Sequence, residues 1–309
     1  MPSLNKISGQ ILDIFENRIF SGEIIISNKK IAKIVEKPVS SDNLIAPGFI
    51  DAHIHIESSM LTPENFGMHV VKHGTIGLVC DPHEIANVLG VPGVLFMINN
   101  SQSSPLKFSF GAPSCVPATS FEDSGSKILV KDIEFLFEKN IAGFLSEMMN
   151  YPGVINQDPH IIEKINIAKQ FKRNIDGHAP GLSGKDLEKY INYGISTDHE
   201  CINIEEAIEK IDKGMYVLIR EGSAAKNFNA LYPLIDKFPE RVMLCSDDLH
   251  PDDLIKGHIN LLVKRAIKNQ INLFNVWRAA SYNPAQHYKL KTGLLRRNDP
   301  ADFIVLEDK

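Results

Sequence analysis

The chain has 309 residues and a formal net charge of -5 at pH 7, which argues against a protein built to bind nucleic acid or another polyanion. This length suits one large α/β barrel with a small appendage better than two equal domains. The four cysteines are scattered and the first residues contain no apolar signal core, so we expect reduced thiols in a cytoplasmic protein without a membrane partner.

The two flanks of the chain predict a small β domain. Within residues 1–46, residues 8–36 contain short runs rich in isoleucine, separated by Gly22 and the polar residues 27–30, which is typical of strands and turns. Residues 299–306 predict a turn and one more strand that can return to this sheet. We therefore expect a β-sandwich domain in which residues 291–309 complete residues 1–46.

Residues 47–290 alternate short β-rich runs with longer segments of helical period. The helical segments include residues 158–172, 183–192, 251–269 and 273–280. The strand candidates number eight and occupy residues 48–56, 75–84, 107–117, 142–150, 174–180, 195–200, 215–223 and 242–250. This rhythm is typical of βα units around a parallel sheet, and it predicts a (β/α)8 TIM-like barrel of the α/β class.

Polar side chains stand where these strands end, which is where a barrel of this kind carries its chemistry. His53 and His55 flank Ile54, so alternation along a strand places both imidazoles on one face. Taken alone, His178 or Glu147 is more often a hydrogen-bonded structural residue than a ligand. Burying many such groups at one rim without a cation would cost several kcal/mol in desolvation. The polar strand ends comprise His53, His55, Asp81–Glu84, Glu147, His178, Asp198–Glu200, Arg220, Glu221, Asp247 and Asp248. Together they predict a metal site.

Five further histidines and a core cysteine receive no chemical role. The histidines fall on predicted helices or loops: His69, His73, His160, His258 and His287. Cys245 lies within the eighth predicted strand, and we expect it to pack in the core.

Longer blocks carry a family resemblance over nearly the entire chain. They read PGFIDAHIHIESSM at residues 47–60, DPHEIANV at 81–88, SEMMNYPGV at 146–154 and GHAPGLSG at 177–184, with further blocks at 198–201, 220–227, 245–248 and 250–253. These blocks resemble the amidohydrolase superfamily and, within it, adenine deaminases of the bacterial type. The resemblance implies a dinuclear centre of manganese or iron, with zinc as an alternative, and no organic cofactor. Members of this type continue past the position of Lys309 into a further domain, so we expect either a shorter member or an incomplete chain.

The resemblance also implies roles for single residues. His53 and His55 would bind one ion, His178 and His199 the other, and Glu147 would bridge them. Asp247 would contact an ion and the nucleophilic water, and His199 and Asp247 are both counted as catalytic. The implied reaction is hydrolytic deamination of adenine to hypoxanthine and ammonia by a metal-activated hydroxide.

The proton donor to the purine ring has two candidates, Glu84 and Glu221. We prefer Glu84, since Asp81 and His83 beside it could tune its pKa or hold a further cation. Arg220 either contacts the purine or pairs with Glu221. The substrate-binding candidates come from the same loops: Arg220, His83, Ser223 and Asp248.

Other functions remain open at this point, because a fold does not determine a substrate. One is another amidohydrolase reaction, either hydrolysis of a cyclic amide or deamination of a different aminopurine. Another is a catalytically silent, truncated relative. The blocks at residues 81–88 and 220–227 favour a purine deaminase that acts in purine salvage, and we expect a homo-oligomer, with a dimer favoured.

Overall fold

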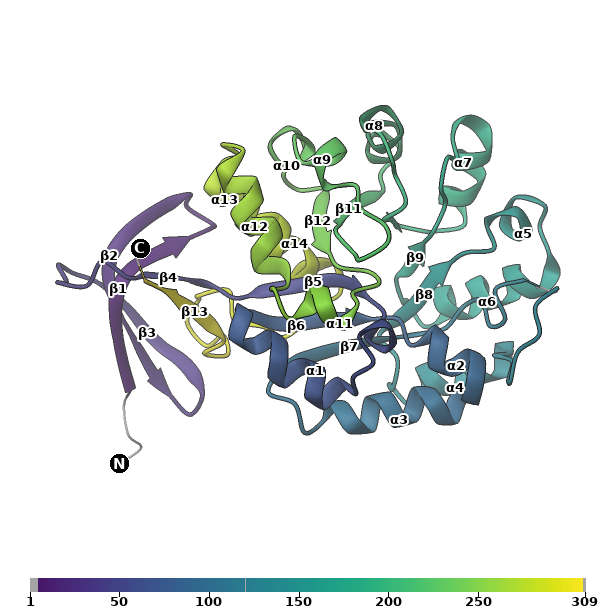
Figure 1. Cartoon of the computed structure of the whole chain (residues 1–309), viewed down its shortest axis with the longest axis horizontal. Coiled ribbons are helices and arrows are strands. Elements are labelled where there is room, and N and C mark those ends of the chain that lie inside the picture. The colour runs from purple at the N-terminus through teal and green to yellow at the C-terminus, as the bar shows by residue number, and fades with distance from the viewer. Residues whose placement is uncertain (1–4, 120, 308–309) are drawn as a thin grey trace.

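The structure is a computed structural model that describes residues 5–119 and 121–307. It consists of a barrel flanked by a small separate sheet (Figure 1). Among the described residues, no helix combines the length and the hydropathy that a membrane crossing requires.

Eight parallel strands form the barrel, in chain order. Strands β5 to β9 pair as one sheet and β10 to β12 as another. Parallel bridges from Ile175 to Ile195 and from Ile54 to Asp247 join the two sheets, and the predicted barrel is thereby confirmed. The strands are β5 (Phe49–Ile54), β6 (Thr75–Cys80), β7 (Lys107–Ala112), β8 (Phe144–Met148), β9 (Ile175–Gly177), β10 (Thr197–Asp198), β11 (Tyr216–Arg220) and β12 (Val242–Cys245).

The predicted strands extend too far at their C-terminal ends. The polar residues that follow each strand bend into loops instead of continuing the ladder, so His55, His178 and His199 lie just after β5, β9 and β10. This places their side chains at the rim of the barrel.

Helices cover the outside of the barrel, above and below the strands in Figure 1. They are α1 (Pro63–Val70), α2 (His83–Leu89), α3 (Val91–Ser101), α4 (Val130–Glu138), α5 (Tyr151–Ile155), α6 (Pro159–Gln170), α7 (Gly184–Asn192), α8 (Ile204–Asp212), α9 (Phe228–Leu231), α10 (Leu234–Lys237), α11 (Pro251–Leu254), α12 (Ile259–Lys268), α13 (Leu273–Trp277) and α14 (Asn283–His287). Three further helical turns are η1 (Ile56–Ser59), η2 (Val71–His73) and η3 (Arg278–Tyr282). The helix predicted over residues 251–269 is divided into α11 and α12, because Gly257 between them adopts φ 150°.

Apolar side chains pack on both sides of the strands. Ala52, Phe144, Leu218 and Cys245 belong to one buried cluster, which confirms Cys245 as a core residue. A larger cluster joins strands β11 and β12 to helices α8, α9, α12 and α13. The rim that carries the polar residues is thus supported by a packed apolar core.

The small sheet contains strands from both flanks of the chain. Its order is β13 (Phe303–Leu306), β4 (Leu44–Pro47), β1 (Asn5–Asp13), β2 (Arg18–Ser27) and β3 (Lys30–Glu36). Strand β13 pairs antiparallel to β4, as predicted for residues 299–306. We expected the two packed sheets of a β-sandwich here. Among the described residues, the five strands instead pair side by side in one continuous sheet. The division of the chain at residues 46 and 290 stays a prediction.

Candidate metal centre

The predicted metal ligands meet at one end of the barrel. His53 lies on β5 and Glu147 on β8, and the others follow directly after strands: His55 after β5, His178 after β9, His199 after β10 and Asp247 after β12. All six come from C-terminal strand ends, which gather at one rim of a parallel barrel. Five of them are buried, and His178 is partly exposed.

Glu147 is the centre of this cluster. Its Oε1 lies 3.3 Å from His55 Nε2, and its Oε2 lies 2.7 Å from His178 Nδ1 and 3.2 Å from His199 Nε2. The two oxygens of one carboxylate therefore face two different sets of imidazoles. This is the arrangement that a bridging carboxylate needs.

Asp247 approaches the cluster from the opposite side of the barrel. Its Oδ1 lies 3.3 Å from His55 Nε2 and 3.6 Å from His53 Nε2, while its Oδ2 accepts a hydrogen bond from Arg220 Nη1. Asp247 has a positive φ of 58°, an uncommon backbone conformation for a residue other than glycine. The main chain thus turns sharply where the side chain enters the cluster.

The donor set fits divalent metal ions. His55 Nδ1 lies 3.0 Å from the carbonyl oxygen of Asp81; because a carbonyl only accepts, this ring nitrogen carries the proton and leaves Nε2 free to bind a metal. His53 Nε2 lies only 3.1 Å from His55 Nε2, so one nitrogen of each ring points into the same space. Donor atoms of His53, His199 and Asp247 lie within 4.8 Å of one another, as do those of Glu147, His178 and His199.

The carboxylates of the cluster are held in the ionised form that metal ligands need. Burial raises the pKa of Glu147, but hydrogen bonds to His178, His199 and His55 outweigh it and hold the pKa well below 4.5. Burial likewise raises the pKa of Asp247, yet contacts with His53 and His55 hold that pKa below its usual value.

A buried network supports the histidines that follow β9 and β10. Lys210 on α8 donates to the carbonyl of Ala179, to Asp198 Oδ2 and to Glu206 Oε1, at 2.7, 3.0 and 2.7 Å. Asp198 also accepts from the backbone N–H of Ala179 at 2.8 Å. This ammonium therefore ties together the two loops that carry His178 and His199.

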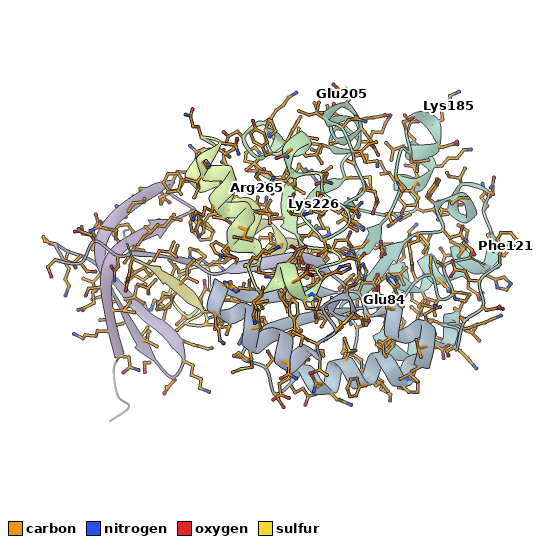
Figure 2. All side chains as sticks on the ribbon, in the orientation of Figure 1. Glu84, Phe121, Lys185, Glu205, Lys226 and Arg265 are labelled. Carbon is orange, nitrogen blue, oxygen red and sulfur yellow. The ribbon has the colours of Figure 1, made fainter. Side chains whose placement is uncertain are left out.

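Three of the predicted rim residues lie beside the cluster. Glu84 extends from the start of α2 (Figure 2), where Ser58 Oγ lies 3.5 Å from its Oε1. Ser58 also donates to Asp248 Oδ1 at 2.5 Å, and a donor oxygen of Asp248 lies close to His55 and Asp247. His83 Nδ1 lies 3.5 Å from Glu147 Oε1.

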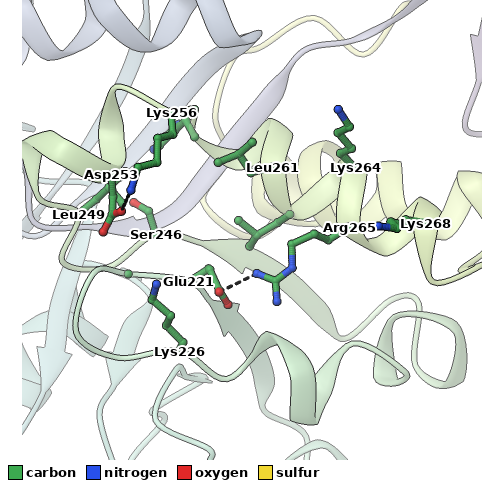
Figure 3. A pocket seen from close by; sticks show the side chains of 14 residues that line it. Glu221, Lys226, Ser246, Leu249, Asp253, Lys256, Leu261, Lys264, Arg265 and Lys268 are labelled. Carbon is green, nitrogen blue, oxygen red and sulfur yellow. Dashed lines mark hydrogen bonds and ion pairs between the residues drawn. The ribbon is translucent and has the colours of Figure 1, made fainter.

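Glu221 and Ser223 are not brought to the cluster. Glu221 forms an ion pair with Arg265 of α12 at 2.6 Å and faces a separate pocket that Lys226 also lines (Figure 3). The reason is alternation along the chain: Arg220 at the end of β11 points to the cluster, so its neighbour points away. Ser223 donates to Asp253 at 2.8 Å instead.

The sequence offered Glu221 as another partner for Arg220, but this ion pair does not form. Arg220 pairs with Glu200 through both of its terminal nitrogens, at 2.5 and 2.7 Å, and with Asp247. Glu200 lies 3.3 Å from His199 Nε2 and 3.5 Å from His178 Nδ1. Glu200 stands among the polar strand ends of the sequence but has no individual role in the prediction, although its position directly after His199 was a signal.

Comparisons with known proteins agree with this architecture. Residues 44–309 match the family described as "Amidohydrolase family". An adenine deaminase from Sulfurovum sp. (strain NBC37-1) is 54% identical over 303 residues, which make up 98% of this chain and 57% of that protein. An adenine deaminase from Methanosarcina mazei is 51% identical over 306 residues, or 99% of this chain and 55% of that protein. The chain thus spans little more than half the length of these relatives.

Solved structures show the same fold at low sequence identity. N-acetyl-D-glucosamine-6-phosphate deacetylase from Mycobacterium smegmatis superposes with a TM-score of 0.71 at 12% identity, covering 98% of this chain and 95% of the other. A 5-methylcytosine deaminase from Klebsiella pneumoniae, liganded with 5-fluorocytosine, gives 0.64 at 12% identity, covering 97% and 91%. These likenesses concern the fold alone.

Proposed function

The chain belongs to the amidohydrolase family, and we propose that it hydrolyses adenine to hypoxanthine and ammonia. The observation that carries this proposal is the 54% identity with a relative named adenine deaminase over 98% of this chain. The convergence of imidazoles on both oxygens of Glu147 supports it, because hydrolysis at a poor electrophile requires an activated water.

We assign two divalent ions to the cluster. His53, His55 and Asp247 would hold one, His178 and His199 the other, and Glu147 would be shared between them. Manganese or iron, with zinc as an alternative, suits this set of nitrogen and oxygen donors. When bound, such ions lower the pKa of water and so supply a nucleophile near neutral pH.

We assign to Asp247 the transfer of a proton from the attacking water to the leaving nitrogen. Its Oδ2 is engaged by Arg220, so its Oδ1, which faces His53 and His55, is the oxygen that can accept a proton from the attacking water. The same oxygen returns that proton to the amino nitrogen on C6 of adenine, the C6–N bond breaks and ammonia departs. The second proton of the water leaves the C6 hydroxyl as the carbonyl of hypoxanthine forms, and it replaces the proton that the acid at N1 has given up. Arg220 acts here as a positioning residue, since Glu200 and Asp247 occupy its guanidinium.

We assign Glu84 as the acid that donates a proton to N1 of the purine. Electron density builds on N1 as C6 becomes tetrahedral, and a carboxylic acid at that nitrogen stabilises the charge. The contacts among Glu84, Ser58 and Asp248 support this role, since they form a polar row that leads from Glu84 to the cluster. Glu221 is the weaker candidate because Arg265 occupies it in another pocket.

The test is ammonia release by the chain purified from cells supplied with Mn²⁺. Adenine is compared with other aminopurines and with a panel of cyclic amides, and metal content is measured on the same sample. We expect adenine to be the preferred substrate. A metal-replete protein that hydrolyses a cyclic amide but leaves adenine intact would establish the other amidohydrolase reaction, and one that binds no metal would be the silent relative.

The expected homo-oligomer and the role in purine salvage stay predictions. Size-exclusion chromatography with light scattering measures the first.

A further inference from the structure

A second set of metal-ligating side chains adjoins the cluster on the side of strand β6. It consists of Asp81, which follows β6, and His83, which begins α2, together with His55 and Glu147. Donor atoms of these four residues all lie within 4.8 Å of one another. Asp81 and His83 are the members that the assignment of two ions leaves unused.

The Asp81 carboxylate is buried without hydrogen-bond donors. Asp81 is 1% exposed, and among the described residues neither of its carboxylate oxygens accepts a hydrogen bond. The close polar contact that the described part of the chain provides is His83 Nδ1, 3.1 Å from Oδ2, which makes an ion pair with the carboxylate only when the imidazole is protonated. A buried carboxylate in this condition is costly unless a positive charge compensates it.

Other buried acids of the barrel are satisfied, which makes Asp81 an exception. Asp198 accepts hydrogen bonds from Ala179 N–H and Lys210 Nζ at 2.8 and 3.0 Å. Asp51 accepts from Ser246 N–H at 3.0 Å. Burial of an acid in this fold is thus normally matched by donors.

The position of Asp81 is set by the strand next to it. Its backbone N–H donates to the carbonyl of Ile54 at 3.0 Å, and its own carbonyl lies 3.0 Å from His55 Nδ1. These contacts hold the backbone of Asp81 against β5, at a position where its side chain is buried.

His83 supplies a nitrogen at the same place. Its Nδ1 makes no hydrogen bond and is shielded from solvent, and it lies 3.1 Å from Asp81 Oδ2 and 3.5 Å from Glu147 Oε1. Two carboxylates and one imidazole therefore face a common point, and this donor set is one that divalent transition metals prefer.

We propose that Asp81 and His83, with the Oε1 edge of Glu147, form a third position for a divalent transition-metal ion beside the two-ion centre. The inference concerns metal binding and holds whichever reaction the centre performs. The position adjoins Glu84, the next residue in the chain, so an ion there adds positive charge on the side of the site where we place the purine.

The experiment counts Mn²⁺ ions by equilibrium dialysis of the purified full chain, followed by elemental analysis. We expect three equivalents at saturation in the natural sequence and two in His83→Asn and Asp81→Asn. His160→Asn serves as the matched control, because His160 is exposed at the start of α6, and should retain three. Thermal unfolding of each variant verifies that it is folded.

Saturation of the natural sequence at two equivalents would overturn the proposal and identify Asp81 and His83 as an ion pair. A third equivalent that persists in His83→Asn would overturn it as well, by placing the extra ion elsewhere. If Asp81→Asn does not fold, the metal count of His83→Asn alone tests the proposal. The His83 side chain is partly exposed, so we expect that variant to fold. Ammonia release plays no part in these readings, so failure of the deaminase proposal is distinguished from failure of this one.

Discussion

The backbone N–H of Asp247 donates to the carbonyl of His53 at 2.9 Å, while the Asp247 side chain lies 3.6 Å from His53 Nε2. The pair therefore joins the first and last strands of the barrel and also faces the metal cluster. The parallel bridge between Ile54 and Asp247, which completes the sheet, also holds the His53 and Asp247 side chains close together. Closure of the barrel therefore assembles this part of the site.

Asp247→Asn should retain metal and lose turnover. The amide keeps an oxygen for the ion but cannot accept the proton, and proton transfer of this kind contributes about 10²–10⁴-fold to rate. Ammonia release from adenine and metal content, measured on one preparation, check this. Asp252→Asn on α11, where the side chain is exposed, is the control. Turnover near the natural level in Asp247→Asn would contradict the assigned role.

Glu84→Gln should impair deamination far more than Glu221→Gln. Glutamine cannot deliver a proton to N1, whereas Glu221 is engaged by Arg265 outside the cluster. We expect a loss of about 10²-fold or more in kcat for the first variant and a small change for the second. The reverse order, measured as kcat for adenine at saturating Mn²⁺, would exchange the two assignments.

Lys210→Met should destabilise the fold. The ammonium is fully buried with Asp198 and Glu206, so its removal leaves buried carboxylates without compensation, at a cost of about 3–5 kcal/mol. Denaturant unfolding measures this loss. Lys213→Met is the matched control. Lys213 directly follows the last residue of α8 and pairs with Glu188 at the surface, so the free energy of unfolding of this variant should be close to that of the natural sequence.

His287 should make the fold sensitive to mild acid. Burial, with a smaller contribution from Arg241, lowers the pKa of His287 to about 4. An unfolded chain takes up that proton near pH 6.5, so the stability that neutral His287 contributes is lost as the pH falls from about 6.5 to 4.

One pKa unit corresponds to about 1.4 kcal/mol, so the loss in the free energy of unfolding reaches about 3 kcal/mol. His287→Gln should therefore show a smaller drop in the free energy of unfolding between pH 7 and pH 5 than the natural sequence does. His160→Gln is the control and should behave as the natural sequence. Equal drops in all three proteins would contradict the burial of a neutral imidazole at position 287.

Removal of metal should lower the melting temperature. Without a cation, the buried carboxylates of Glu147 and Asp247 rely on imidazoles that must become charged. A ligand that binds only the folded state stabilises it by about 2.7 kcal/mol at a hundredfold excess over its Kd. A chelator should reduce the melting temperature, and Mn²⁺ should restore it. Glu147→Gln should respond much less, and an equal response would place the metal away from Glu147.

Several features of the site follow from local chain properties and were predictable from sequence. Alternation puts His53 and His55 on one face of a strand, and the carboxyl ends of parallel strands meet at one rim. These rules brought Glu147, His178, His199 and Asp247 together without knowledge of the packing. The chain order of the barrel strands follows from the same alternation of β and helical segments.

The partners of the loop side chains were decided only by the tertiary structure. Glu221 turns to Arg265 on a helix 44 residues further along the chain, and Glu200 rather than Glu221 takes Arg220. The burial of Asp81 without a donor likewise depends on β5 beside it. Pairing beyond a strand end depends on which partners long-range packing brings within a few ångströms, and neighbouring residues in the sequence do not carry that information.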